Sequence, residues 1–154
     1  MATWSDFATQ APELAADVRG RLDAHVHKTL ATLRRDGAPR ISGTETQIID
    51  GDLWIGSMWQ ARKAHDLQRD PRYALHSGSD DPPAWTGDAK LAGHAEEITD
   101  PERVKAINGP QGAAGSSHLF RLDLTEVSTV SVGSDGLRLW VWTEAGGERI
   151  TERR

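Results

Sequence analysis

The sequence contains no cysteine among its 154 residues. This absence excludes disulfides, thiolate metal ligands and a cysteine nucleophile, and it fits a reducing cytoplasm. No apolar run approaches the ~20 residues that a membrane-spanning helix needs. The first ten residues also lack the basic patch and apolar stretch of a secretory signal. We therefore expect a cytoplasmic protein with no membrane partner.

Positive charge is in deficit, since 18 basic residues face 23 acidic ones and the net charge is −5. A nucleic-acid-binding protein usually has a basic face, so this balance argues against a nucleic-acid partner. One region is nevertheless basic, and it holds Arg34, Arg35, Arg40, Arg62, Lys63, Arg69 and Arg72. An acidic protein with one basic region indicates a small anionic ligand as its partner.

Several motifs of catalysis and metal binding are missing. The glycine-rich stretch Gly109–Gly115 is not followed by Lys-Ser/Thr, as a phosphate-binding loop would be. Gly56-Ser57-Met58 lacks the second glycine of a hydrolase nucleophile elbow. His25 and His27 form a His-x-His pair, but no third ligand stands at a suitable spacing, so we expect no metal site.

The hydrophobic pattern predicts short strands with a few helices. Thr3–Phe7 reads as a loose lead-in, and helices are expected over Pro12–Asp23, from Arg62 to Asp70 and from Pro101 to about Asn108. Turn-rich loops are expected at Ser77–Gly87, which contains Trp85, and at Gly109–Ser117. Strands are expected over Lys28–Leu33, Arg40–Ile49, Leu53–Met58, Tyr73–His76, Asp88–Ile98, His118–Leu124, Thr125–Gly133 and Leu137–Thr143.

Strands at this close spacing are typical of an antiparallel barrel or roll, a mainly β fold with peripheral helices. No boundary divides the chain, so residues 1–154 are expected to form a single domain with a helical N-terminal segment at about 11–23. The polar residues 146–154 are expected to be a partly mobile tail. Trp140 and Trp142 share one face of the last predicted strand, where they are candidates for a dimer contact.

The stretch Leu53–His76 predicts a ligand site. A strand leads through a short turn into a helix whose first residues are Arg62 and Lys63, and free N–H groups at a helix start attract anions. A phosphate site and a solvated basic helix start are both compatible with this pattern. The small and polar residues of Ser42–Gln47 likewise fit either a strand that lines a polar ligand or an edge strand that faces water.

These residues resemble a known family. Gly56-Ser57, Ala61-Arg62-Lys63-Ala64-His65 and Asp70-Pro71-Arg72 are similar to the flavin-phosphate segment of the pyridoxamine 5′-phosphate oxidase-like split-barrel family. Thr32–Arg40 also resembles that family's first hairpin, so the resemblance covers roughly Asp23–Ile98 and, more loosely, the rest of the chain. It implies a split barrel that forms a homodimer with FMN, or the deazaflavin F420, at the interface.

The resemblance also implies roles for individual residues. Arg62 and Lys63 would bind the cofactor phosphate, and Gly56 and Ser57 would lie under the ribityl chain and phosphate. Asp88 falls where the family often has a glutamine that touches the ring edge. The strand that lines the isoalloxazine ring would contain Ser42, Gly43, Thr44, Glu45, Thr46 and Gln47.

Three positions depart from the family pattern: Ser42 and Gln47 stand where the family usually has basic residues, and Asp88 replaces an amide. No match to the pyridoxal-phosphate-binding residues of the oxidase is present. We therefore expect a flavin- or deazaflavin-dependent oxidoreductase with another small-molecule substrate, and no catalytic side chain is assigned. The alternative is a non-catalytic split barrel that binds a cofactor or a tetrapyrrole. The roles of Trp59 and Trp85 remain open.

Overall fold

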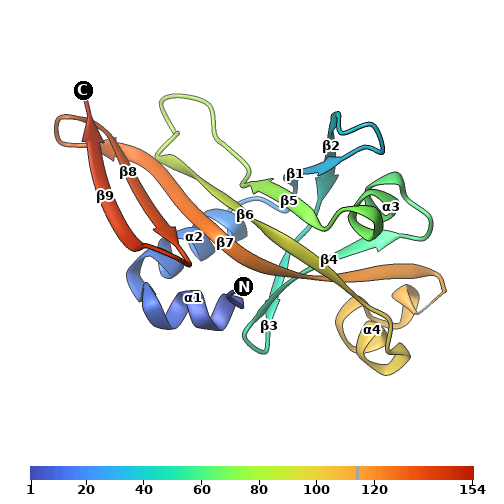
Figure 1. Ribbon diagram of the computed structural model, residues 1–154. Coiled ribbons are helices and arrows are strands. Elements are labelled where there is room, and N and C mark those ends of the chain that lie inside the picture. Colours follow the sequence, from blue (N-terminus) through green and yellow to red (C-terminus); the bar gives the residue numbers. More distant parts are fainter. Residues whose placement is uncertain (114) are drawn as a thin grey trace.

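A computed structural model describes residues 1–113 and 115–154 as a mainly β protein with few helices (Figure 1). The helices are α1 (Trp4–Gln10), α2 (Pro12–Asp23), α3 (Arg62–Arg69), α4 (Pro101–Asn108) and the short 3-10 helix η1 (Pro110–Gly112). The strands are β1 (Lys28–Leu33), β2 (Pro39–Thr44), β3 (Gln47–Ile49), β4 (Asp52–Met58), β5 (Arg72–His76), β6 (Gly87–Ile98), β7 (Ser117–Gly133), β8 (Gly136–Thr143) and β9 (Gly147–Arg153). No helix in the described ranges is long and apolar enough to cross a membrane.

The strands form one antiparallel sheet in the order β2-β1-β5-β6-β7-β4-β3, to which β8 and then β9 are added beside β7. The predicted single strand Arg40–Ile49 is wrong, because β2 pairs with β1 whereas β3 pairs with β4. Only Glu45 and Thr46 separate these two strands, although they lie at opposite ends of the strand order. The sheet therefore curls until its two ends meet at this two-residue connection.

β7 is the longest strand and runs through the whole sheet (Figure 1). The prediction of two strands, His118–Leu124 and Thr125–Gly133, is wrong, because β7 is continuous and pairs along its length with β6. The register shifts at Ala92/Gly93, where Thr125 is the extra residue of a β-bulge. A Cβ on Gly93 would lie 1.9 Å from the Asp123 carbonyl oxygen, so only glycine fits this close approach.

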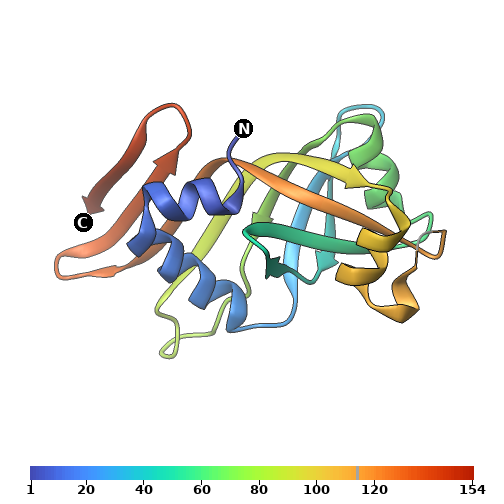
Figure 2. The same cartoon turned by 90° about the horizontal axis from the view of Figure 1, so that it is seen from below.

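The two N-terminal helices lie along one face of the sheet (Figure 2). The predicted helix Pro12–Asp23 is confirmed as α2. The predicted lead-in at Thr3–Phe7 is wrong: Thr3 and Asp6 form a capping box that starts α1. Phe7 is buried 5.0 Å from Trp142, measured between ring centroids. Trp142 is therefore part of the core of its own chain and is not a dimer contact.

The stretch predicted to be a partly mobile tail, residues 146–154, contains a strand. Residues Gly147–Arg153 form β9, which pairs with β8 in a hairpin that projects away from α3 and α4 (Figures 1 and 2). Every β9 residue is exposed, which explains a polar sequence without an apolar alternation. Trp140 of β8 donates its indole N–H to Glu148 at 3.0 Å and so helps to hold the two strands together.

Candidate functional site

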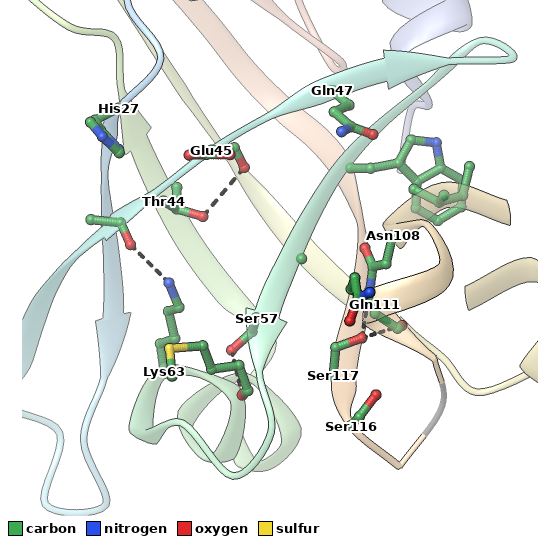
Figure 3. A pocket seen from close by; sticks show the side chains of 16 residues that line it. His27, Thr44, Glu45, Gln47, Ser57, Lys63, Asn108, Gln111, Ser116 and Ser117 are labelled. Atoms are coloured by element: carbon green, nitrogen blue, oxygen red, sulfur yellow. Dashed lines mark hydrogen bonds between the residues drawn. The ribbon is translucent and has the colours of Figure 1, made fainter. Parts of the chain in front are cut away.

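A cavity of about 550 Å³ opens where the two ends of the sheet meet. Figure 3 shows it between the β2–β3 connection on one side and the segment from α4 to Ser117 on the other, with β4 passing between them. Its size lies in the 300–1,000 Å³ range of ordinary ligand pockets. The structure brings together here seven residues predicted from sequence: Gly43, Thr44, Glu45, Gln47, Gly56, Ser57 and Lys63.

Lys63 is the cation of the predicted pair that lines the cavity. Its Nζ donates a hydrogen bond to the Gly43 carbonyl at 2.8 Å, which directs the ammonium toward β2 (Figure 3). Burial lowers the pKa of this ammonium below its usual range, because it is partly removed from water. Ala61, the residue before α3, offers no side-chain cap to the first amides of the helix. An anion in the cavity would meet the Lys63 ammonium close to this helix start.

Arg62 is exposed and does not line the cavity, although it adjoins Lys63 in the sequence. Successive residues of a helix point about 100° apart, and here this rotation directs Lys63 toward the cavity and Arg62 toward solvent. The structure therefore separates the predicted cation pair: Lys63 lies at the cavity and Arg62 lies outside it.

Most of the other basic residues in this region are bound to acidic ones. Asp66, a buried residue of α3, accepts hydrogen bonds from Thr32 at 2.8 Å, Arg40 at 2.6 Å and Arg69 at 3.0 Å. Burial alone raises the pKa of Asp66, but these hydrogen bonds outweigh it and hold the pKa below its usual range. Arg72 pairs with Asp70 on the surface at 2.7 Å. This cluster fixes α3 on β1 and β2.

The opposite wall of the cavity was not predicted from sequence. Asn108, the last residue of α4, donates from Nδ2 to the Ser117 hydroxyl at 2.9 Å and to the His118 carbonyl at 3.1 Å. A Cβ on Gly56 would lie 2.9 Å from Asn108 Oδ1, so this glycine lets the amide lie close against β4. The polar members of this wall are amides and hydroxyls: Asn108, Gln111, Ser116 and Ser117.

Three further predicted residues do not line the cavity. Ser42 lies in β2 opposite Leu30, and Thr46 lies in the β2–β3 connection. Asp88 lies in β6, where its Oδ2 is 3.9 Å from His76 Nε2. The His-x-His pair also diverges, because His25 is 3.1 Å from Asp80 whereas His27 lines the cavity.

Of the two tryptophans without a predicted role, Trp59 is placed by clear contacts. Its ring stacks on His118 with centroids 4.5 Å apart and planes 13° apart. Trp85 is half-buried in the loop before β6. Sequence reasoning missed two chemistry-bearing residues, Asn108 and His118, which lie 32 and 42 residues after His76. Nothing local to either position indicates the cavity.

Comparison with known proteins identifies the family. The family model described as pyridoxamine 5′-phosphate oxidase matches residues 14–131, which include the whole curled sheet from β1 into β7. The chain belongs to the pyridoxamine 5′-phosphate oxidase-like family. The match covers both walls of the cavity, so the family resemblance read from Asp23–Ile98 is confirmed and extends beyond that range. No curated protein shows a significant match to the chain.

Solved structures of similar proteins share the fold of this family member. An FMN-binding protein related to pyridoxamine 5′-phosphate oxidase from Nostoc punctiforme is 14% identical with a TM-score of 0.68, covering 90% of this chain and 94% of its own. A heme-binding protein from Mycobacterium smegmatis is 21% identical with a TM-score of 0.64, covering 83% of this chain and 57% of its own. A conserved hypothetical protein from Mycobacterium tuberculosis is 22% identical with a TM-score of 0.60, and the match covers 74% of this chain and 82% of that protein.

Proposed function

We propose that this chain binds FMN in the cavity and acts as a flavin-dependent oxidoreductase. The observation that carries the proposal is Lys63, a partly buried ammonium at the uncapped start of α3 that lines a cavity of about 550 Å³. Removing a cation from water is unfavourable unless a partner compensates it, and one carbonyl is a weak partner for an ammonium. A terminal phosphate would supply the missing negative charge.

The donor set of the cavity fits a ligand with one charged end and one neutral, polar end. Lys63 and the first amides of α3 suit the phosphate, whereas Gln47, Asn108 and Gln111 offer amide groups that suit the carbonyl and N–H edge of a flavin ring. The bound flavin would supply the hydride chemistry, and the protein would bind it, orient it and exclude water.

FMN is favoured over F420 because basic residues near the cavity are already engaged in ion pairs. F420 carries a longer acidic tail, which would need an extended basic groove. Arg40 and Arg69, which would form part of such a groove, are instead bound to Asp66. One ammonium at the cavity matches a single phosphate better than a chain of carboxylates.

A homodimer is part of the proposal. The ladder registers place Ala31, Ala74 and Ala92 in one row across β1, β5 and β6, next to the exposed Ile41 of β2. This row borders a second hollow, of about 290 Å³, on the outer face of the sheet. A second copy of the chain would cover this apolar surface, and sedimentation at several concentrations would measure the dimer.

The test is a fluorescence titration with FMN and with riboflavin, which lacks the phosphate. We expect Lys63→Gln to weaken FMN binding roughly 10- to 100-fold, as for a charged hydrogen bond, and to leave riboflavin binding nearly unchanged. Arg62→Gln is the matched control and should have little effect on either ligand. Anaerobic addition of NADH or NADPH should then bleach the bound flavin near ~450 nm.

Three results would contradict the proposal. Binding of F420 without FMN would assign the deazaflavin branch. Uptake of heme without any flavin would support a tetrapyrrole-binding protein like the M. smegmatis neighbour. Equal loss of FMN affinity in the Arg62 and Lys63 variants would show that the cavity is not where the phosphate binds.

A further inference from the structure

The turn between β4 and α3 determines where the helix begins and therefore where Lys63 lies. Gln60, in this turn, has a φ of +60°, a left-handed conformation that non-glycine residues adopt only when their surroundings hold them there. Ala61 donates its N–H to the Met58 carbonyl at 3.1 Å and accepts from Ala64 at 3.0 Å. A change in the conformation of Gln60 would shift the first amides of α3 together with Lys63.

His118 of β7 holds this turn. Its Nε2 accepts a hydrogen bond from the Gln60 backbone N–H at 3.1 Å, and its ring stacks under Trp59 at 4.5 Å. The imidazole is only 4% exposed and lies opposite Ser57 in the β4–β7 ladder. In addition to the Ala61–Met58 hydrogen bond within the turn, one hydrogen bond and one aromatic contact therefore connect the turn to the His118 side chain.

The second ring nitrogen of His118 continues the network. Nδ1 lies 2.6 Å from Glu97 Oε1, and Glu97 Oε2 accepts from Gln68 of α3 at 2.8 Å. Because Nε2 accepts from Gln60, it carries no proton, so the ring is neutral and Nδ1–H donates to Glu97. Glu97 therefore connects His118, which contacts the turn, to Gln68 of α3.

A second proton on the His118 ring would disfavour the contact with the Gln60 N–H and favour the contact with Glu97. At Nε2 it would place an N–H against the Gln60 N–H and break that hydrogen bond, whereas the Glu97 carboxylate would pair with the imidazolium. Three uncharged residues also lie beside His118: Trp59 in the turn, Ser57 on β4 and Phe120 on β7. His65 of α3 reaches the network only through Gln68, at 3.3 Å.

We propose that His118 is a pH-sensitive positioning residue: neutral, it holds the β4–α3 turn in the geometry that binds the ligand anion, and protonated, it releases the turn. The part concerning the ligand rests on the proposed function, whereas the part concerning the turn is a property of the unliganded chain. Lower pH then weakens binding of the anion through the protein as well as through the titration of the phosphate itself.

The first test uses the protein without ligand. The hydrogen-exchange protection factor of the Gln60 amide, measured by NMR, should fall at least about tenfold between pH 8 and pH 5.5, as for loss of one hydrogen bond. Trp59 fluorescence should change over the same range, with Trp59→Phe as the subtraction control. In His118→Gln, which keeps an acceptor near Nε2 and has no ionisable ring, both signals should stay constant with pH.

The second test is FMN affinity at the same two pH values. Wild-type affinity should fall about tenfold more than that of His118→Gln, whose remaining pH dependence is that of the phosphate. His118→Phe, which keeps the stack and lacks the acceptor, should bind weakly at both pH values. Equal pH dependence in wild type and His118→Gln, or a Gln60 amide whose protection does not change with pH, would overturn the inference. Failure of every variant to bind FMN at pH 8 would contradict the proposed function, while the Gln60 exchange result would still decide the role of His118.

Discussion

The two walls of the cavity are each built on a short helix, but they present opposite ends of it. α3 presents its first turn with Lys63, and α4 presents its last residues, Ile107 and Asn108. The partial charge is positive at the start of a helix and negative at its end. The α3 wall therefore attracts an anion, whereas the α4 wall repels one and offers uncharged hydrogen-bonding groups. A ligand bound between them is oriented before any specific contact is formed.

The walls also differ in how they are supported. The α3 wall rests on a buried carboxylate that binds two arginines and a threonine, and the α4 wall rests on the Asn108 amide against Gly56 and Ser117. A buried charge cluster is far more sensitive to loss of one member than an amide contact is. The following changes would test this difference.

The largest effect is expected from Asp66→Ala. This change leaves Arg40 and Thr32 without their buried acceptor, so the free energy of unfolding should fall by about 3–5 kcal/mol in urea denaturation. Asp70→Ala, which removes an exposed partner of Arg72 next to the same helix, is the control and should cost far less. A similar loss in the two variants would show that Asp66 does not support the α3 wall.

Acid should weaken the same wall by a smaller amount, since protonation leaves the shape of the Asp66 carboxyl intact. The pKa of Asp66 in the folded state lies below the ordinary value of 3.8. Its contribution to stability is therefore fully present above pH 3.8 and is lost as the pH falls through the lower folded value. Urea denaturation between pH 6 and pH 2.5 should show this loss in wild type and a shallower one in Asp66→Asn.

A double-mutant cycle between Gly56 and Asn108 tests the α4 wall. Gly56→Ala should push the Asn108 amide from its hydrogen bonds and cost about 1–2 kcal/mol of unfolding free energy. The same change in an Asn108→Ala background should cost clearly less, because the obstructed amide is gone. Additive losses would mean that Gly56 is required for another reason, such as close approach of the ligand.

The smallest effect is expected at Gln111, an exposed member of the α4 wall. Gln111→Ala should weaken FMN and riboflavin equally, by about three- to tenfold, because a neutral hydrogen bond contributes about 1 kcal/mol and this wall does not bind the phosphate. Fluorescence titration of both ligands measures it. A loss specific to FMN would place the phosphate at the α4 wall and reverse the orientation proposed here.

Local signals in the sequence predicted much of the fold. Pro12 at the first turn and Leu14, Val18 and Leu22 at helical spacing defined α2 with its observed bounds. The capping box of Thr3 and Asp6 was also present, but so short a helix is stable only when Trp4 and Phe7 are buried against distant partners.

The missed features depend on which strand pairs with which. The break at Glu45 follows from the separate partners of β2 and β3, and the continuity of β7 follows from its ladder with β6, across the bulge at Thr125. β9 was read as a tail because its side chains are exposed and only its backbone is ordered by β8. The local amino-acid composition indicates none of these strand pairings.

The residues of the site likewise fall into those that a local sequence motif predicts and those that depend on the tertiary structure. Gly43–Glu45, Gly56, Ser57 and Lys63 are close to one another in the sequence, and the motif that contains them was recognisable. The sequence could not distinguish Lys63 from Arg62, because that choice depends on the rotation of α3 about its axis. Asn108 and His118 reach the site through β7 and α4, far along the chain.

The two-residue connection between β2 and β3 has a consequence for the cavity. Glu45 of this connection lines the cavity, and the flanking strands β2 and β3 pair with β1 and β4, away from each other. Insertions at this point would change the dimensions of the entrance and leave every strand pairing in place. A change in this short connection would therefore alter the size of ligand that the cavity admits without altering the sheet.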